Sequence, residues 1–258
     1  MSNPHVPNVA TGYKPLVSCV VPVFNGEPFL AEALESILAQ TYRPIEIIVA
    51  DDGSTDGTRG IAQAFGEQIR FETQPTAGPA ETRNLGIRAA RGELIAFLDA
   101  DDLWYPEKLW RQIASLRERP EREACVTHVQ LFWTPDLEAE RQQYRDHPRA
   151  QPVPGYASTT LLARRRAFDK VGLFNRELWF SDATEWFIRA REQQVQNRAA
   201  AGCAGVPPYA RAESDPKTLS SQPPGIREGG QRVSGPPAPK EPRSGCGECR
   251  VFRCRLFK

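Results

Sequence analysis

Three short polar segments follow apolar runs in this sequence, and their residue types could hold a cation or an anionic ligand. The segments are Pro22 to Gly26, Asp51 to Thr58 and Asp99 to Asp102. Carboxylate oxygens are the ligands that Mg²⁺ and Mn²⁺ prefer, and such an ion can bridge a diphosphate to a protein. The three acids of the last segment repel one another unless a cation joins them. The spacing therefore predicts a divalent-metal site that uses Asp101 or Asp102.

The phosphate-binding signatures of two large enzyme classes are missing. No Gly-x-Gly-x-x-Gly follows the first apolar run, and no Gly-x-x-x-x-Gly-Lys loop occurs, which argues against dinucleotide oxidoreductases and phosphate-loop NTPases. A nucleotidyltransferase is disfavoured for the same reason. The 33 Lys and Arg nearly balance the 32 Asp and Glu, so we expect no nucleic-acid partner. His128 and His147 lack partners at the spacing of metal ligands.

The elements that must position these acids alternate between short apolar strands and amphipathic helices. This alternation is typical of an α/β fold with a mostly parallel central sheet. The expected strands are 17–23, 45–50, 69–72, 94–98 and 125–132, and the expected helices are 28–40, 56–65, 78–90 and 106–119. Ligands bind beyond the carboxyl ends of the strands in such sheets, so the three polar segments should meet at one edge.

Beyond residue 133 the pattern is less regular. Residues 134–154 read as a helix or a lid-like excursion, 156–163 as a further strand and 182–194 as a helix. Cys19 and Cys125 lie in apolar runs and are expected to be reduced core residues.

In order and spacing, the motifs resemble those of the inverting family 2 glycosyltransferases, which have the GT-A fold. The resemblance covers about residues 16–194. It rests on Val20-Val21-Pro22-Val23-Phe24-Asn25, Asp51-Asp52-Gly53-Ser54-Thr55-Asp56, Gly78-Pro79-Ala80-Glu81-Thr82-Arg83-Asn84-Leu85-Gly86, the Asp-x-Asp at Asp99 and Asp101, and Val171-Gly172-Leu173-Phe174 ahead of Asp182.

This resemblance implies a donor site and a catalytic base. Asp51 or Asp52 would contact the nucleobase, Asp99 the ribose, and Asp101 a Mg²⁺ or Mn²⁺ ion on the two phosphates, with Asp102 as a second metal candidate. The other residues implied in donor binding are Pro22, Phe24, Asn25, Arg83, Asn84 and Ala100. Asp182 is the first candidate for the base and Glu185 the second, because Ala183 replaces one member of the family's acidic pair.

Structural interpretations of the same residues stay open. Asp51, Asp52 and Asp56 could cap the following helix, as Asp often does. Trp104, Trp133, Trp179 and Trp186 could stack on sugars or pack in a core. The run Arg164 to Arg166 suits a solvated face or an anionic acceptor.

The chain divides into three parts by composition. Residues 1–14 are expected to be flexible, 15–195 to form the glycosyltransferase domain, incomplete at its carboxyl end, and 196–258 to be disordered because they are rich in Pro and Gly. Reading the codons of residues 198–211 one base later permits a credible strand, so a frameshift could have produced this tail. Cys246 and Cys249 could imitate half a zinc site whose other half is missing.

The resemblance also implies partners. They are a nucleotide-sugar donor, with a UDP-sugar favoured, and a glycan or lipid-linked acceptor. No apolar run approaches the length of a membrane span and no secretory signal opens the chain, so the cytoplasm is expected, with peripheral membrane association left open. The competing hypothesis is a non-catalytic product that keeps nucleotide binding but has no turnover.

Overall fold

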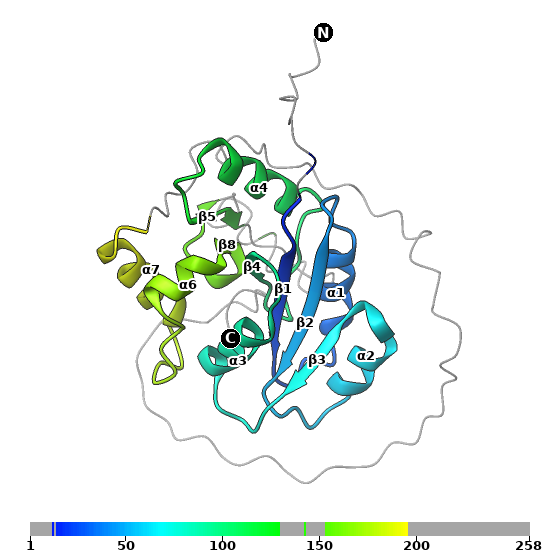
Figure 1. Ribbon diagram of the computed structural model, residues 1–258. Helices are drawn as coiled ribbons and strands as arrows, with labels where there is room; N and C mark the ends of the chain where they lie inside the picture. Colours follow the sequence, from blue (N-terminus) through cyan, green and yellow to red (C-terminus); the bar gives the residue numbers. More distant parts are fainter. Residues whose placement is uncertain (1–11, 13, 130–141, 143–152, 196–258) are drawn as a thin grey trace, which may run out of the picture. The chain divides into compact units, whose positions relative to one another are not determined.

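A computed structural model of the chain describes residues 12, 14–129, 142 and 153–195, and its centre is a six-stranded sheet (Figure 1). The strand order is β3-β2-β1-β4-β8-β5. β1 to β4 are mutually parallel, whereas β8 runs antiparallel to both β4 and β5. The strands are β1 (Val17–Val23), β2 (Ile45–Asp51), β3 (Arg70–Thr73), β4 (Leu94–Phe97), β5 (Ala124–Val126) and β8 (Leu161–Arg164). A second small sheet pairs β6 (His128–Val129) with β7 (Val153–Pro154).

Helices cover both faces of the large sheet. They are α1 (Leu30–Leu38), α2 (Thr58–Ala64), α3 (Pro79–Ala89), α4 (Lys108–Glu118), α6 (Arg165–Val171) and α7 (Asp182–Glu192), with 3₁₀ turns η1 (Gly66–Gln68) and η4 (Ser158–Thr160). None of the helices in the described part of the chain is long and apolar enough to cross a membrane.

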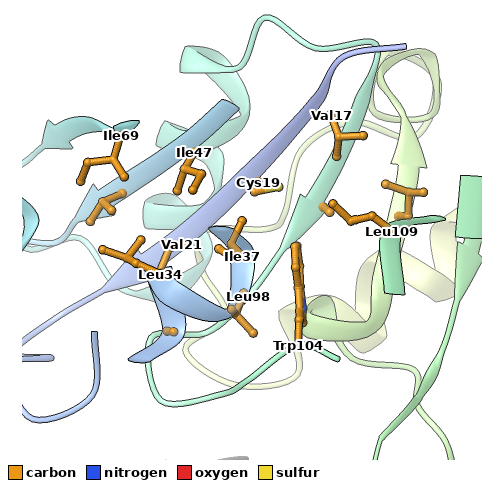
Figure 2. Packing of buried hydrophobic residues seen from close by; sticks show 14 of the residues in the cluster. Val17, Cys19, Val21, Leu34, Ile37, Ile47, Ile69, Leu98, Trp104 and Leu109 are labelled. Atoms are coloured by element: carbon orange, nitrogen blue, oxygen red, sulfur yellow. The ribbon is translucent and has the colours of Figure 1, made fainter. Parts of the chain in front are cut away.

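The alternation of side chains along the strands builds two separate cores. Val17, Cys19 and Val21 of β1 face the first core, which α1, α2 and α4 cover (Figure 2). Val20 faces the second core, which α3, α6 and α7 cover. Successive residues of a strand point to opposite faces, so an almost wholly apolar strand such as β1 requires cover on both.

The reversal in strand order locates the ligand-binding edge. The chain moves outward from β1 through β2 to β3, then returns to place β4 on the other side of β1. Ligands of open α/β sheets bind at such a switch point, beyond the carboxyl ends of the strands. The segments that follow β1 and β4 are the two that carry Asn25 and Asp99 to Asp102.

Most of the expected elements are confirmed. The four parallel strands agree with the predicted bounds to one residue, and α1 to α4 and α7 agree to two. The single strand expected at 125–132 is wrong: β5 and β6 belong to different sheets, because Thr127 between them donates its N–H to the Thr160 carbonyl instead. Residues 130–132, most of 134–154, and the tail lie outside the described residues.

Two further expectations are corrected after residue 155. The strand expected at 156–163 begins only at Leu161, because the Thr160 hydroxyl donates to the carbonyls of Gly155 and Ala157, both at 2.8 Å, and closes a turn. Helix α6 follows directly and was not expected. Arg164 and Arg165 are not a solvated face: Arg164 donates to the Leu116 and Arg122 carbonyls, and Arg165 to those of Ala90 and Gly92.

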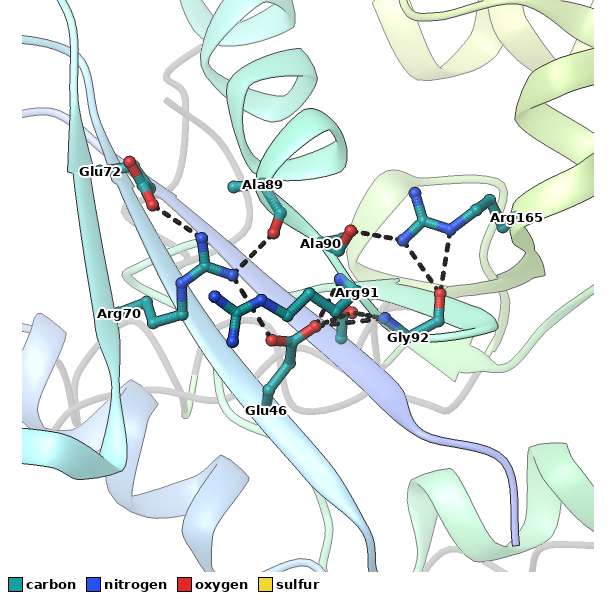
Figure 3. Close-up of polar contacts among 9 residues, drawn as sticks. Glu46, Arg70, Glu72, Ala89, Ala90, Arg91, Gly92 and Arg165 are labelled. Atoms are coloured by element: carbon teal, nitrogen blue, oxygen red, sulfur yellow. Dashed lines mark hydrogen bonds and ion pairs between the residues drawn. The ribbon is translucent and has the colours of Figure 1, made fainter.

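A polar network lies at the amino ends of the parallel strands, which we call the amino edge of the sheet (Figure 3). This is the end opposite the ligand-binding edge. The Glu46 carboxylate accepts hydrogen bonds from the Arg91 N–H at 2.6 Å and from the Ser18 hydroxyl at 2.5 Å. Arg70 lies 3.6 Å from it and donates to the Ala89 carbonyl at the end of α3. These contacts fix the carboxyl end of α3 against β1 and β2.

Candidate active site

The loops after β1 and β2 are joined by hydrogen bonds. The Asn25 N–H donates to Ser54 Oγ at 2.8 Å, and Asn25 Oδ1 accepts the Thr55 N–H at 2.9 Å. Asn25 has a φ of 51°, a left-handed conformation that Asn adopts more readily than most residues. The side-chain oxygen of Asn25 thus holds the loop after β2 in place. The neighbouring Phe24 is exposed, and Pro22 is buried.

Asp56 holds the start of α2. Its Oδ1 accepts the N–H of Thr58, the first residue of the helix, at 3.0 Å, and its Oδ2 accepts the Glu27 N–H. A carboxylate at the amino end of a helix also interacts favourably with the helix dipole. Asp56 therefore binds the start of this helix, as its capping interpretation expected, although the N-cap residue itself is Gly57.

Asp51 and Asp52 are both buried but serve different elements. Asp51 accepts the Thr73 hydroxyl at 3.0 Å and the Ser54 N–H at 3.2 Å. Asp52 accepts the N–H groups of Ala77 and Gly78, at 2.9 and 3.0 Å, and the side-chain amide of Gln74 at 2.9 Å. Asp52 therefore organises the loop before α3. Its capping interpretation, which expected it to bind the start of α2, is not supported by these contacts.

Arg83 joins two acids that are far apart in the sequence. This residue of α3 is 8% exposed. Its two terminal nitrogens donate to Asp182 Oδ2 at 2.8 Å and to Asp99 Oδ1 at 3.0 Å. Burial opposes the charge of Arg83, but the charges of Asp99 and Asp182 outweigh it, so the pKa of the guanidinium is raised. The acid after β4 and the acid that begins α7 therefore meet at one buried cation.

In the turn after β4, residues 99–102 alternate between partly exposed and buried. The Asp102 N–H donates to the Asp99 carbonyl at 3.0 Å and closes the turn. Asp99 and Asp101 are partly exposed, whereas Ala100 and Asp102 are buried. In the described part of the chain, no three His, Cys, Asp or Glu side chains gather as a metal cage. One partly exposed carboxylate still fits Mg²⁺, which takes one or two carboxylates and completes its shell with phosphates and water.

The two candidate bases differ in their surroundings. Asp182 is 6% exposed and faces Arg83. Ser181 precedes it with a φ of 63°, a conformation that costs a residue with a Cβ about 1 kcal/mol or more. Glu185 pairs with Arg189 one turn along the same helix, and Arg189 also donates to the carbonyls of Val171 and Leu173. Glu185 thus serves the packing of α7 on the segment after α6.

Asn84 lies beside Arg83 in the sequence but serves the fold. Its Nδ2 donates to the Phe174 carbonyl at 2.9 Å, and its Oδ1 accepts the Phe174 N–H at 3.0 Å. Both hydrogen-bonding ends of the amide are therefore used on one backbone unit. Asn84 fastens α3 to the Gly172-to-Phe174 segment and does not present its amide to a ligand.

The described tryptophans separate into core and surface residues. Trp104 and Trp186 are buried and donate to the carbonyls of Thr159 and Gly172. Trp179 is 61% exposed, and its ring lies 3.5 Å from the position that a Cβ on Gly78 would occupy. It stands three residues before Asp182. Trp133 lies outside the described residues.

Sequence reasoning missed the residues that support the acids. Thr73, the last residue of β3, binds Asp51, and Gln74, the first residue after β3, binds Asp52. Glu27 accepts the Gly57 N–H at 2.8 Å and helps to join the first two loops. A polar run directly after the third strand was the available signal, because that strand ends at the same edge as the other parallel strands.

Comparisons with known proteins agree with this arrangement. A glycosyltransferase of Rickettsia typhi, itself described as uncharacterised, is 35% identical over 196 residues, which cover 71% of this chain and 61% of the relative. The chain thus spans less than two thirds of that relative. The structure of Staphylococcus aureus TarS 1–349 with UDP-GlcNAc has a TM-score of 0.56 at 22% identity, over 69% of this chain and 53% of the other.

A second solved structure is similar at a comparable level. Glucosyl-3-phosphoglycerate synthase of Mycobacterium tuberculosis, in complex with Mn²⁺, UDP and glucosyl-3-phosphoglycerate, has a TM-score of 0.52 at 19% identity, over 70% of this chain and 67% of the other. These likenesses establish the GT-A fold. The model of the family described as "Glycosyl transferase family 2" matches residues 18–172, more than half of the chain. The chain therefore belongs to glycosyl transferase family 2.

Proposed function

We propose that residues 15–195 form a catalytic domain that transfers a sugar from a nucleoside-diphosphate donor to an acceptor hydroxyl, with inversion at the anomeric carbon. The observation that carries this proposal is the contact of Arg83 with both Asp99 and Asp182. The Arg83 guanidinium thereby joins Asp99, the acid expected to contact the ribose, to Asp182, the expected base. A single displacement needs these two sides of the sugar to be organised together.

Asp182 is the base in this proposal. Its carboxylate accepts the proton of the acceptor hydroxyl as that oxygen attacks the anomeric carbon. Arg83 donates to this carboxylate at 2.8 Å and orients it before attack, and the burial of Asp182 limits its access to water. Glu185 is the less suitable candidate, because Arg189 donates to both of its carboxylate oxygens, whereas Arg83 donates to one oxygen of Asp182.

The donor lies at the carboxyl edge in the proposal. Asp51 is the better of the two neighbouring acids for the nucleobase, because the Asp52 carboxylate already accepts three hydrogen bonds within the protein. Asp99 contacts the ribose. Asp101 would hold Mg²⁺ or Mn²⁺, which neutralises charge on the departing nucleoside diphosphate when bound. A UDP-sugar is the proposed donor, since both solved relatives described above contain UDP or UDP-GlcNAc; the proposed acceptor is a glycan or a lipid-linked acceptor.

Calorimetry with UDP and Mn²⁺ tests the donor site. We expect Mn²⁺-dependent UDP binding that weakens by on the order of tenfold or more in Asp101→Asn, because a carboxylate contact to the cation is lost. The matched control is Asp169→Asn, an exposed acid of α6, which should bind like the wild type. Equal affinity in Asp101→Asn and the wild type would contradict the proposed metal site.

A donor-hydrolysis assay separates the enzyme from the competing hypothesis. Release of UDP from a UDP-sugar in the presence of Mn²⁺, lost in Asp182→Asn, is the outcome expected of a transferase. Tight UDP binding without turnover over a panel of UDP-sugars would favour the non-catalytic product instead. Absence of binding would overturn both.

A further inference from the structure

The structure points to Arg83 as a positioning residue that holds the Asp182 carboxylate in place and ties this acid to the donor-side Asp99. The inference rests on the proposed function for its meaning in catalysis. The contacts on which it depends are independent of any ligand. They are the two hydrogen bonds from the terminal nitrogens of one guanidinium, at 2.8 and 3.0 Å.

The burial of the three groups makes the contact consequential. The side chains of Arg83 and Asp182 are 10% and 9% exposed, whereas that of Asp99 is 34% exposed. A buried carboxylate without a cation favours its neutral form, and a neutral acid cannot accept a proton. Asp99 can be partly stabilised by water. Asp182 depends far more on Arg83.

The other charged groups around Asp182 are occupied elsewhere. On α7 itself, Glu185 and Arg189 pair with each other. On α6, which packs against α7, Arg165 binds carbonyls at the end of α3, while Asp169 and Lys170 are exposed. On α3, Arg88 pairs with Glu81 at 2.6 Å. Among the residues that the structure describes, Arg83 is thus the cation that faces Asp182.

The fork geometry of arginine explains why this residue type stands here. Two terminal nitrogens of a planar guanidinium can each donate to a different carboxylate and fix their separation. Within the described part of the chain, the buried Nε of Arg83 has no hydrogen-bond partner, so the two carboxylates are the groups that orient the side chain. A lysine would keep the charge but could not fix both acids in one plane.

The carboxyl NMR signal of Asp182 tests the inference without requiring turnover. The full chain is labelled with ¹³C at the aspartate carboxyl carbons, and the Asp182 signal is assigned by its loss in Asp182→Asn. At pH 7 we expect Arg83→Gln to move the Asp182 signal away from its wild-type position, because the carboxylate loses the guanidinium that orients it. Arg88→Gln, which changes an exposed arginine of the same helix, should leave the signal unchanged. An unchanged Asp182 signal in folded Arg83→Gln would overturn the inference.

Arg83→Lys provides the test if Arg83→Gln does not fold. It should also move the Asp182 signal, but less than Arg83→Gln does, because the ammonium keeps the charge without the fork. In the donor-hydrolysis assay, the pH profile of kcat/KM should change in both variants. A residue needed only for folding would lower the rate without changing the shape of that profile.

The same measurements distinguish this inference from the proposed function. Failure of the wild type to bind UDP with Mn²⁺ would remove the proposed function, while the Asp182 signal would still report on Arg83. Conversely, active wild-type protein whose Asp182 signal does not respond to the loss of Arg83 would remove the inference alone.

Discussion

Asp182 and Glu185 lie on the first turn of α7 but have different partners, which allows their roles to be separated. Asp182 contacts Arg83 in the buried site, whereas Glu185 pairs with Arg189 on the helix surface. We predict that Asp182→Asn lowers kcat for donor turnover by about 10²- to 10⁴-fold with little change in UDP affinity, because general-base catalysis contributes that much.

Glu185→Gln is the matched control for Asp182→Asn. It should retain kcat within a few-fold and lower the thermal midpoint slightly, because a partly exposed ion pair contributes about 0–1 kcal/mol. Steady-state kinetics and thermal unfolding of the two variants check both statements. A larger kcat loss in Glu185→Gln than in Asp182→Asn would assign the base to Glu185.

At the scale of one element, the position of α3 depends on a close approach to the sheet. A Cβ added to Gly86 would lie 2.2 Å from Cγ1 of Val20 on β1, so the helix could not remain where it is. We predict that Gly86→Ala lowers the free energy of unfolding by about 1–3 kcal/mol through overpacking. Urea denaturation measures the change.

Gly60 provides the opposite case in α2. Apart from its chain neighbours and the backbone of its own helix, no heavy atom of the described residues lies within 4 Å of a Cβ placed there. Gly60→Ala should therefore stabilise the protein by about 0.5–1 kcal/mol, the usual gain for this change inside a helix. If both alanine variants changed stability in the same direction, the packing of α3 against Val20 would not be the cause.

The network at the amino edge makes the stability of this element depend on pH. Burial alone would raise the pKa of Glu46, but hydrogen bonds from Ser18, Arg91 and Gly92 and the charge of Arg70 lower it below its ordinary value of 4.5. A carboxylate whose pKa is lower in the folded state stabilises the fold above its unfolded pKa. That stabilisation is lost as the pH falls from about 4.5 through the folded pKa.

Glu46→Gln tests this pH dependence. The variant should be less stable than the wild type at pH 7, and the difference should shrink as the pH falls below about 4.5. Unfolding curves at several pH values measure it, with Glu121→Gln, an exposed residue, as the control. A difference that grows at low pH would have the wrong sign.

For the whole molecule, the first core should shield both of its cysteines until global unfolding. Cys19 and Cys125 are buried in that core, and burial raises the pKa of the Cys19 thiol to about 12. In a variant with Cys203, Cys246, Cys249 and Cys254 replaced by serine, we predict no rapid reaction with Ellman's reagent under native conditions. Both thiols should react in denaturant. Rapid native modification of either would show that its core opens locally.

The sequence predicted the parallel half of the sheet and the location of the acids, because both depend on local patterns. Apolar runs such as residues 17–23 and 45–50 predict strands. Polar residues directly after such runs must lie at the carboxyl ends of those strands. The start of strand β8 was predicted wrongly, and helix α6 was not expected. Their bounds depend on the Thr160 turn and on arginines that bind distant carbonyls, and such contacts cannot be predicted from a local sequence pattern.

What the sequence determined by itself was the class of fold, the family and the set of candidate residues, since these follow from periodicity and from motifs in a fixed order. Only the tertiary structure decided the roles within that set. Arg83 and Asn84 are neighbours in one motif, yet one joins Asp99 to Asp182 and the other fastens Phe174. Successive residues of a helix point in different directions, and what each one meets is set by chain segments far away in the sequence.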